Sequence, residues 1–216
     1  MKRHSKILIS AVLAFFGLII GQAQAASNVT VDAANKSISF QATVNGAYMK
    51  EGSWHLAVYE GGTNKGKSLF SVAKATPEEV HKALEDIGGK PGDNMTSTNV
   101  GQPNVKVKGT SLDVYVSWDG QSEPLKLQNV LKELKPNKKA TGIDIKFGGN
   151  LSDAGKSAGT GCIICMYSCP AGITSNAKMN SHKLTNQDKG AYRYLGNSAK
   201  LPKDGTEVTI TLKIKK

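Results

Sequence analysis

The sequence predicts a mainly β fold, β-sandwich-like or mixed α+β, with one short helix and a long loop segment rich in glycine and cysteine. Three observations support this prediction. Short runs of alternating apolar and polar residues recur along the chain, as expected for strands that bury one face. Only residues 76–91 combine helical periodicity with start and stop signals. Regular periodicity fades at about 150–200, where all three cysteines lie.

The expected strands follow from alternation with a period of two residues. The first two, residues 29–32 and 37–42, flank a turn and predict a hairpin. The run at 112–118 ends at Asp119-Gly120, which is a strong turn signal. Three further runs are predicted as strands, at residues 54–59, 142–147 and 206–214.

One helix is predicted from its boundary residues. Thr76 can cap the helix, Pro77 fits the first helical position, and Glu79 completes a capping box with Thr76. Gly88-Gly89 ends it. The apolar stripe of this helix consists of Val80, Ala83, Leu84 and Ile87.

The first 25 residues have the organisation of a secretory signal peptide. A positively charged start precedes an apolar run at 7–20, which is too short to cross a membrane comfortably, and residues 23–25 form a small-x-small cleavage site. We therefore expect residues 1–25 to be removed and 26–216 to form a single domain. The expected location is periplasmic or secreted, after export of an unfolded chain and without stable membrane insertion after cleavage.

The charge of the chain favours no nucleic-acid partner. The formal net charge of +11 falls by three when the basic residues of the signal segment are removed. The remaining basic residues are scattered lysines, with Arg193 as the one arginine beyond residue 25. Nucleic-acid readers favour arginine interleaved with aromatic residues, so we interpret the charge as a solvated surface.

All three cysteines fall in one short run with the spacing C-x2-C-x3-C-P, formed by Cys162, Cys165, Cys169 and Pro170. This is the second half of the run that holds a four-iron cluster in bacterial ferredoxins. The position of the first ferredoxin cysteine is occupied by Gly159, which cannot be a ligand. A cluster would need a fourth ligand such as His182, and an exported unfolded chain cannot carry a cluster with it.

A single metal ion is the second interpretation of the run. Three thiolates with one further ligand form a common zinc set, and soft thiolates also suit Cu(I). The expected cofactor is therefore a metal ion, Zn, Cu or Fe, or an iron–sulfur cluster, held by Cys162, Cys165 and Cys169 with His182 as the candidate extra ligand.

A disulfide is the third interpretation. Cys162-x-x-Cys165 has the spacing of thiol–disulfide oxidoreductases, but no βαβ pattern surrounds it, and a single bridge would leave one thiol unpaired. Covalent haem is excluded because Met166, not histidine, follows Cys165. His55, in the run at 54–59, is expected to be a buried, hydrogen-bonded residue.

Two blocks of the sequence resemble the YdjY-like family of bacterial exported proteins. The first runs from His55 to Phe70 and continues through the helix to Gly92; the second is Gly161–Gly172, followed by Ser175-Asn176. Together they cover most of residues 50–180. The resemblance implies a fold family more than a function, and some members carry ferredoxin-like labels because of the cysteine run.

We therefore predict an exported protein with a metal centre or iron–sulfur cluster in a three-cysteine loop. It would serve redox or electron transfer with a redox partner protein. The competing interpretation is a non-catalytic binding or structural module with one disulfide and no cofactor. Catalysis has no support in the sequence beyond the cysteines.

Overall fold

The computed structural model describes residues 27–134, 138–151, 159–180 and 194–216. The predicted signal peptide and His182 therefore lie outside the described residues. The strands are β1 Thr30–Asp32, β2 Ser37–Val44, β3 His55–Tyr59, β4 Ser68–Val72, β5 Ser111–Ser117, β6 Leu125–Lys126, β7 Leu131–Glu133, β8 Lys138–Lys139, β9 Ile145–Phe147, β10 Cys162–Cys165, β11 Thr174–Asn176, β12 Tyr194–Gly196 and β13 Glu207–Ile214. The helices are η1 Gly46–Met49, α1 Pro77–Asp86 and α2 Leu127–Val130.

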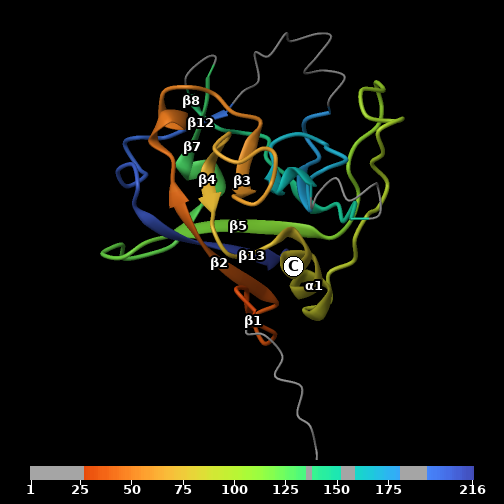
Figure 1. The fold of residues 1–216 in the computed structure, drawn as a ribbon, viewed down its shortest axis with the longest axis horizontal. Helices are drawn as coiled ribbons and strands as arrows, with labels where there is room; N and C mark the ends of the chain where they lie inside the picture. The colour runs from red at the N-terminus through yellow and green to blue at the C-terminus, as the bar shows by residue number, and fades with distance from the viewer. Residues whose placement is uncertain (1–26, 135–137, 152–158, 181–193) are drawn as a thin grey trace, which may run out of the picture.

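The main sheet closes on itself. Its strands pair in the order β2-β13-β5-β9-β11-β10-β3-β4, and β4 pairs again with β2. Figure 1 labels β2, β13, β5, β3 and β4 of this ring. Strands β1 and β6 extend this barrel by pairing with β2 and β5. A separate small sheet contains β12, β7 and β8. Closure leaves the main ring without open edges.

Alternation predicted the first and last parts of this barrel correctly. β13 pairs with β2 on one side and with β5 on the other. Val208, Ile210 and Leu212 on β13 are buried, and the intervening residues are half-buried. The mainly β class is confirmed. The strand pairings specify a closed barrel. The sequence pattern had not distinguished between a β-sandwich and a mixed α+β arrangement.

The cysteine segment differs from the loop that the sequence predicted. Its described residues supply β10 and β11, which lie next to each other in the barrel. Every residue of both strands is buried. A strand buried on both faces has no apolar–polar alternation, and the signal on which the other strand predictions relied is therefore missing here.

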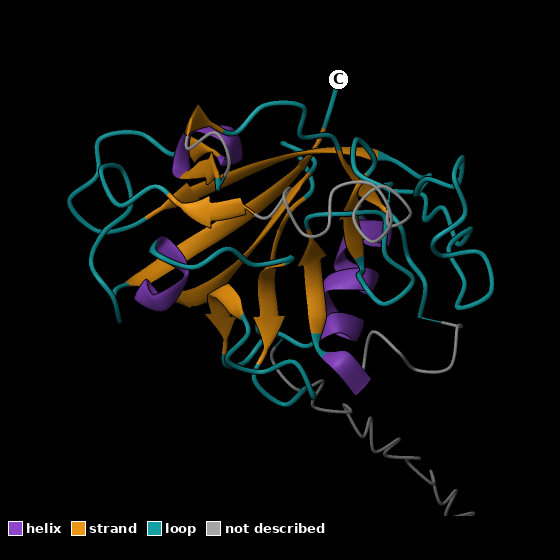
Figure 2. Ribbon diagram, turned by 90° about the horizontal axis from the view of Figure 1, so that it is seen from above, coloured by secondary structure: helices purple, strands orange, loops and turns teal. Residues whose placement is uncertain are grey.

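Helix α1 confirms the predicted helix and its boundaries. Thr76 accepts a hydrogen bond from the backbone N–H of Glu79, and the Glu79 carboxylate accepts from the backbone N–H of Thr76. The Glu79 carboxylate also accepts from Asn28, next to the first strand. Figure 2 shows α1 beside the strands of the barrel, where it contacts β2 and β10.

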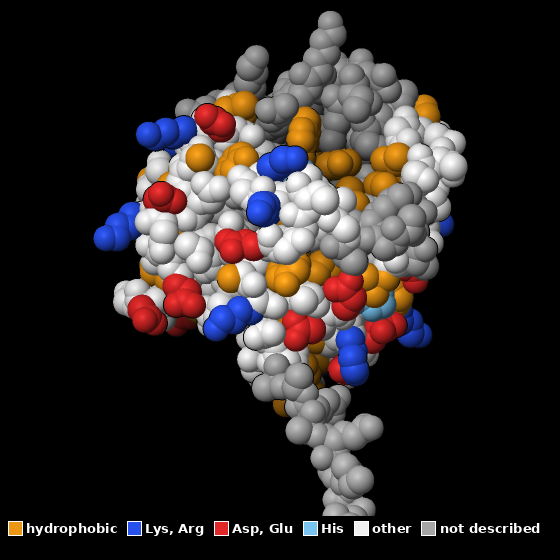
Figure 3. All heavy atoms as spheres, viewed as in Figure 1, with side chains coloured by type: hydrophobic (Ala, Val, Ile, Leu, Met, Phe, Trp, Pro, Cys, Tyr) orange, Lys and Arg blue, Asp and Glu red, His pale blue; other side chains and the backbone are white. Residues whose placement is uncertain are grey.

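Charged side chains of both signs are interspersed on the face shown in Figure 3. This distribution agrees with the expected solvated surface. Within the described residues, no helix has both the length and the apolar character needed to cross a membrane.

The capping box predicts a specific loss of stability. Thr76→Ala removes the side chain that satisfies a backbone N–H at the start of α1, and should lower the free energy of unfolding by about 1 kcal/mol. Chemical denaturation measures this change. Thr63→Ala, at an exposed loop threonine, is the control. Equal stability of Thr76→Ala and the control would contradict the assigned cap.

Candidate metal centre

An irregular pairing between β10 and β3 brings two of the cysteines to the same side of the sheet. In a regular strand, residues three apart point to opposite faces. Here the register shifts on both sides of Ile164, so that Cys162 lies opposite Val58 and Cys165 opposite His55. Cys162 and Cys165 pack together, whereas the intervening Ile163 and Ile164 belong to the main core.

The same pairing places His55 against the cysteines. Its Nδ1 atom lies 3.4 Å from Sγ of Cys162. The ligand atoms of His55, Cys162 and Cys165 all lie within 4.8 Å of one another. His55 is thus hydrogen-bonded, as the sequence predicted, but half-buried and not buried, and its partner is a cysteine thiol. These three residues could hold a metal ion.

The turn after β10 brings Cys169 back to the other two cysteines. Cys169 packs in the same small cluster as Cys162 and Cys165, although its Sγ is not among the ligand atoms that lie within 4.8 Å of one another. Its Sγ accepts a hydrogen bond from the backbone N–H of Ala171 at 3.3 Å. The buried side chain of Asn150 fixes this turn, because its amide donates to the carbonyls of Cys169 and Gly172. We call Cys162, Cys165, Cys169 and His55 the thiol site.

The thiols of the site are buried and unbridged. Cys162, Cys165 and Cys169 are 1%, 0% and 4% exposed, and none forms a disulfide. Gly172 lies so close to the site that a Cβ atom on it would be 2.8 Å from Sγ of Cys165. The structure therefore brings all three predicted cysteines together, with Gly172 packed closely against them.

The three thiols have different acidities. The hydrogen bond from Cys165 is the main cause that lowers the pKa of Cys162 to about 4, with further contributions from His55 and Asn64. The hydrogen bond with Cys165 likewise lowers the pKa of Cys169. The two hydrogen bonds that Cys165 makes to its neighbours, together with its burial, raise its own pKa. Without a metal, Cys165 is therefore the least acidic of the three thiols.

Two other side chains respond to these charges. Burial alone would lower the pKa of His55, but the hydrogen bond with Cys162 and the charges of Cys162 and Cys169 outweigh burial and raise it. Burial, followed by the neighbouring thiolates, raises the pKa of Tyr167, which keeps its hydroxyl protonated. The site thus combines buried thiols of lowered pKa with an imidazole, a donor set that suits a thiophilic cation.

Little in the sequence indicated that His55 belongs to the site. It lies 107 residues before Cys162 in the chain, and no local motif connects them. The one signal was that the first block of the family resemblance begins at His55. His182, the fourth ligand considered from the sequence, lies outside the described residues, so its candidacy stays a prediction.

Comparison with known proteins assigns the domain that carries the thiol site to a family. A family model described as the YdjY domain matches residues 29–213. Over 184 residues the chain is 36% identical to "Uncharacterized protein YdjY" of Escherichia coli (strain K12), covering 85% of this chain and 77% of that protein. No solved structure matches the chain. None of these findings supports a ferredoxin relationship.

The acidity of Cys162 predicts a thiolate in the metal-free, reduced protein at neutral pH. Because its pKa lies near 4 in the folded chain, the thiolate should persist as the pH falls and become protonated only near pH 4. Ultraviolet absorption of the thiolate measures this titration, and Cys162→Ser identifies its component. His55→Ala should raise the pKa of Cys162, because it removes a hydrogen bond and a positive charge. A Cys162 that is still a thiol at pH 7 would contradict this description of the site.

Proposed function

The chain belongs to the YdjY family, and we propose that it is an exported protein that holds a single thiophilic metal ion in the thiol site. The observation that carries this proposal is that the ligand atoms of His55, Cys162 and Cys165 lie within 4.8 Å of one another, with Cys169 packed in the same cluster. Three cysteines and one histidine form a common tetrahedral set for zinc. The proposed ligands are Cys162, Cys165, Cys169 and Nδ1 of His55.

The dimensions of the site favour one ion over a cluster. Metal–ligand distances of about 2.3 Å for sulfur and about 2.0–2.1 Å for nitrogen place tetrahedral ligands about 3.5–3.8 Å apart. The ligand atoms of His55, Cys162 and Cys165 lie within 4.8 Å of one another, close to that spacing. A four-iron cluster would need its ligands spread around several metal atoms. Gly159, at the position of the first ferredoxin cysteine, is exposed and offers no ligand.

Zn²⁺ fits this set best, in a structural role. Four protein ligands leave no open position for a substrate, as in closed zinc sites. The ion would connect β3, β10 and the turn that carries Cys169. The ion would also offset the negative charge of the thiolates. Without a cation, burial of that charge is unfavourable. The proposal that the protein is exported rests on the signal-peptide pattern of residues 1–25.

Electron transfer is the second candidate function, and it requires Cu or Fe in place of Zn. One observation favours it. Tyr167 packs against the cysteine cluster, and its ring makes an edge-on contact with Trp54 at a centroid distance of 5.9 Å. Trp54 is half-buried, so this aromatic pair leads from the thiol site toward the surface. A redox partner protein would dock there.

The cofactor-free alternative has less support. Cys162, Cys165 and Cys169 pack in one cluster, so the packing does not single out one disulfide partner. A module with one disulfide would also leave a buried thiol beside the bridge.

Metal titration tests the proposal directly. The metal-free, reduced protein should bind one Zn²⁺ per chain. Replacing Cys162, Cys165 or Cys169 by serine, or His55 by alanine, should weaken Zn²⁺ binding by at least about tenfold. Loss of an outer residue that only hydrogen-bonds to a metal ligand already weakens binding by about that factor, and loss of a ligand should cost no less. His81→Ala is the matched control, since His81 lies on α1 and pairs with Glu85.

Two results would contradict the proposal. One is a wild-type protein that binds no Zn²⁺, Cu(I) or Fe²⁺. The other is a protein isolated from its native compartment with one disulfide among the three cysteines, one free thiol and no metal.

A further inference from the structure

One polar side chain connects the thiol site to a surface cation. The Asn64 amide donates from Nδ2 to Sγ of Cys162 at 3.5 Å. The oxygen of the same amide, Oδ1, accepts from Nζ of Lys67 at 3.4 Å. Lys67 is exposed, Asn64 is half-buried and Cys162 is buried, so the three residues form a chain from the solvent to the sulfur.

We propose that Asn64, oriented by Lys67, is a positioning residue of the metal centre that stabilises the Cys162 thiolate as a ligand. This inference rests on the proposed function, because it assigns an outer partner to the same metal site. It adds two residues that no motif or comparison identifies.

The backbone holds Asn64 in place. Its N–H donates to the carbonyl of Thr160 at 3.1 Å, and the preceding N–H, of Thr63, donates to Gly159 at 2.9 Å. The loop after β3 is thereby fastened to the segment that enters β10. Gly62 permits this approach, since a Cβ atom on it would lie 2.4 Å from the backbone of Thr160 and Gly161.

Lys67 determines which end of the Asn64 amide faces the sulfur. An ammonium group only donates hydrogen bonds, so it must contact the oxygen of the amide. The NH₂ group is then directed at Cys162. The positive charge on the oxygen side polarises the amide and strengthens the N–H donor toward a negatively charged sulfur.

A buried thiolate ligand needs such donors. Three thiolates around a divalent ion leave an excess negative charge, which N–H groups offset through hydrogen bonds to sulfur. Cys169 receives this donor from the backbone of Ala171. Cys162 receives it from Asn64, a side chain that mutation can remove without changing the ligands themselves.

The test uses Co²⁺ as a spectroscopic probe in the metal-free, reduced full-length mature protein. Asn64→Leu preserves the size of the side chain and removes the donor. It should weaken Co²⁺ binding by about 10–100-fold, the range for loss of an outer partner of a metal ligand. The thiolate-to-cobalt absorption bands should keep the intensity of a three-sulfur site, because every ligand is still present.

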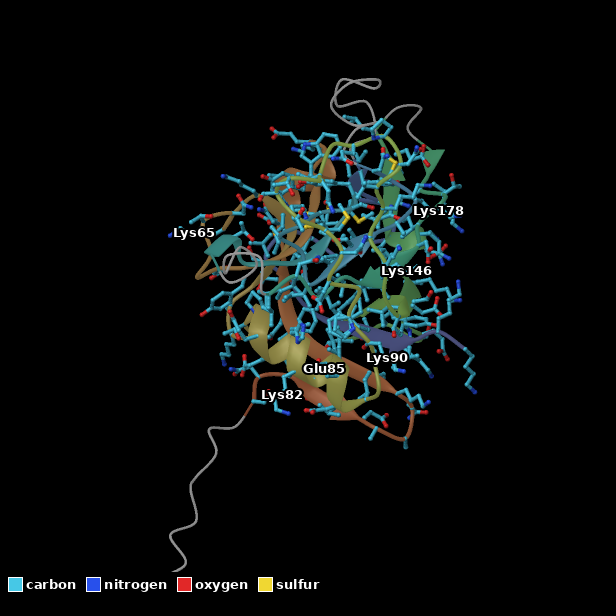
Figure 4. All side chains as sticks on the ribbon, turned by 90° about the vertical axis from the view of Figure 1, so that its right-hand side faces the viewer. Lys65, Lys82, Glu85, Lys90, Lys146 and Lys178 are labelled. Atoms are coloured by element: carbon cyan, nitrogen blue, oxygen red, sulfur yellow. The ribbon has the colours of Figure 1, made fainter. Side chains whose placement is uncertain are left out.

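The role of Lys67 is tested by a double-mutant cycle. Lys67→Ala should weaken Co²⁺ binding by a smaller factor in the wild-type background and should have no further effect in Asn64→Leu, since the two act through the same amide. Lys65→Ala removes the same charge from a side chain that points away from the barrel (Figure 4), and should leave Co²⁺ affinity unchanged. Asn129→Leu, at a half-buried asparagine of α2, is the control for Asn64→Leu.

Each outcome is decisive. A wild-type protein that binds no Co²⁺ overturns the proposed function and this inference with it. A wild type that binds Co²⁺, with an Asn64→Leu variant of equal affinity, overturns only the inference. An equal effect of Lys67→Ala in both backgrounds would show that Lys67 acts through space and not through Asn64. If Asn64→Leu does not fold, Asn64→Ala removes the donor without adding a charge and should show the same loss of affinity.

Discussion

The irregular pairing of β10 with β3 is the constraint on which the site depends. A regular pairing would direct Cys162 and Cys165 to opposite faces of the barrel. The two register shifts around Ile164 place both on one side, opposite Val58 and His55. The same shifts leave Ile163 and Ile164 in the core. Local disruption of a ladder often redirects side chains next to functional sites, and here it creates the ligand cluster.

The barrel also explains why the cluster is buried and negatively charged. β10 lies between β11 and β3, and the turn from Cys169 to Gly172 covers the sulfurs. Hydrogen bonds to Cys162 and Cys169, burial and the charges of both neighbours raise the pKa of Cys165, which keeps its proton. Burial of several like charges is unfavourable unless a cation or donors offset it. A metal ion removes this conflict, and the N–H groups of Asn64 and Ala171 reduce it further.

The sequence predicted the parts of the fold in which one face meets solvent. Apolar and polar residues alternate clearly in β13 and β5, and Thr76 and Pro77 mark the start of α1. It did not predict β10, because a strand buried on both faces shows no alternation. Closure of the barrel was also inaccessible, since it depends on the pairing of β4 with β2. The cysteines were evident from their spacing, but His55 reaches them only through the β3–β10 pairing.

X-ray absorption spectroscopy of the zinc-loaded mature protein tests the central claim most directly. The account predicts one zinc ion with three sulfur ligands at about 2.3 Å and one nitrogen ligand at about 2.0–2.1 Å. In His55→Ala, the nitrogen ligand should disappear while the three sulfurs remain. A first shell made only of oxygen and nitrogen, or zinc–zinc or iron–iron scattering from a cluster, would contradict a single ion held by Cys162, Cys165, Cys169 and His55.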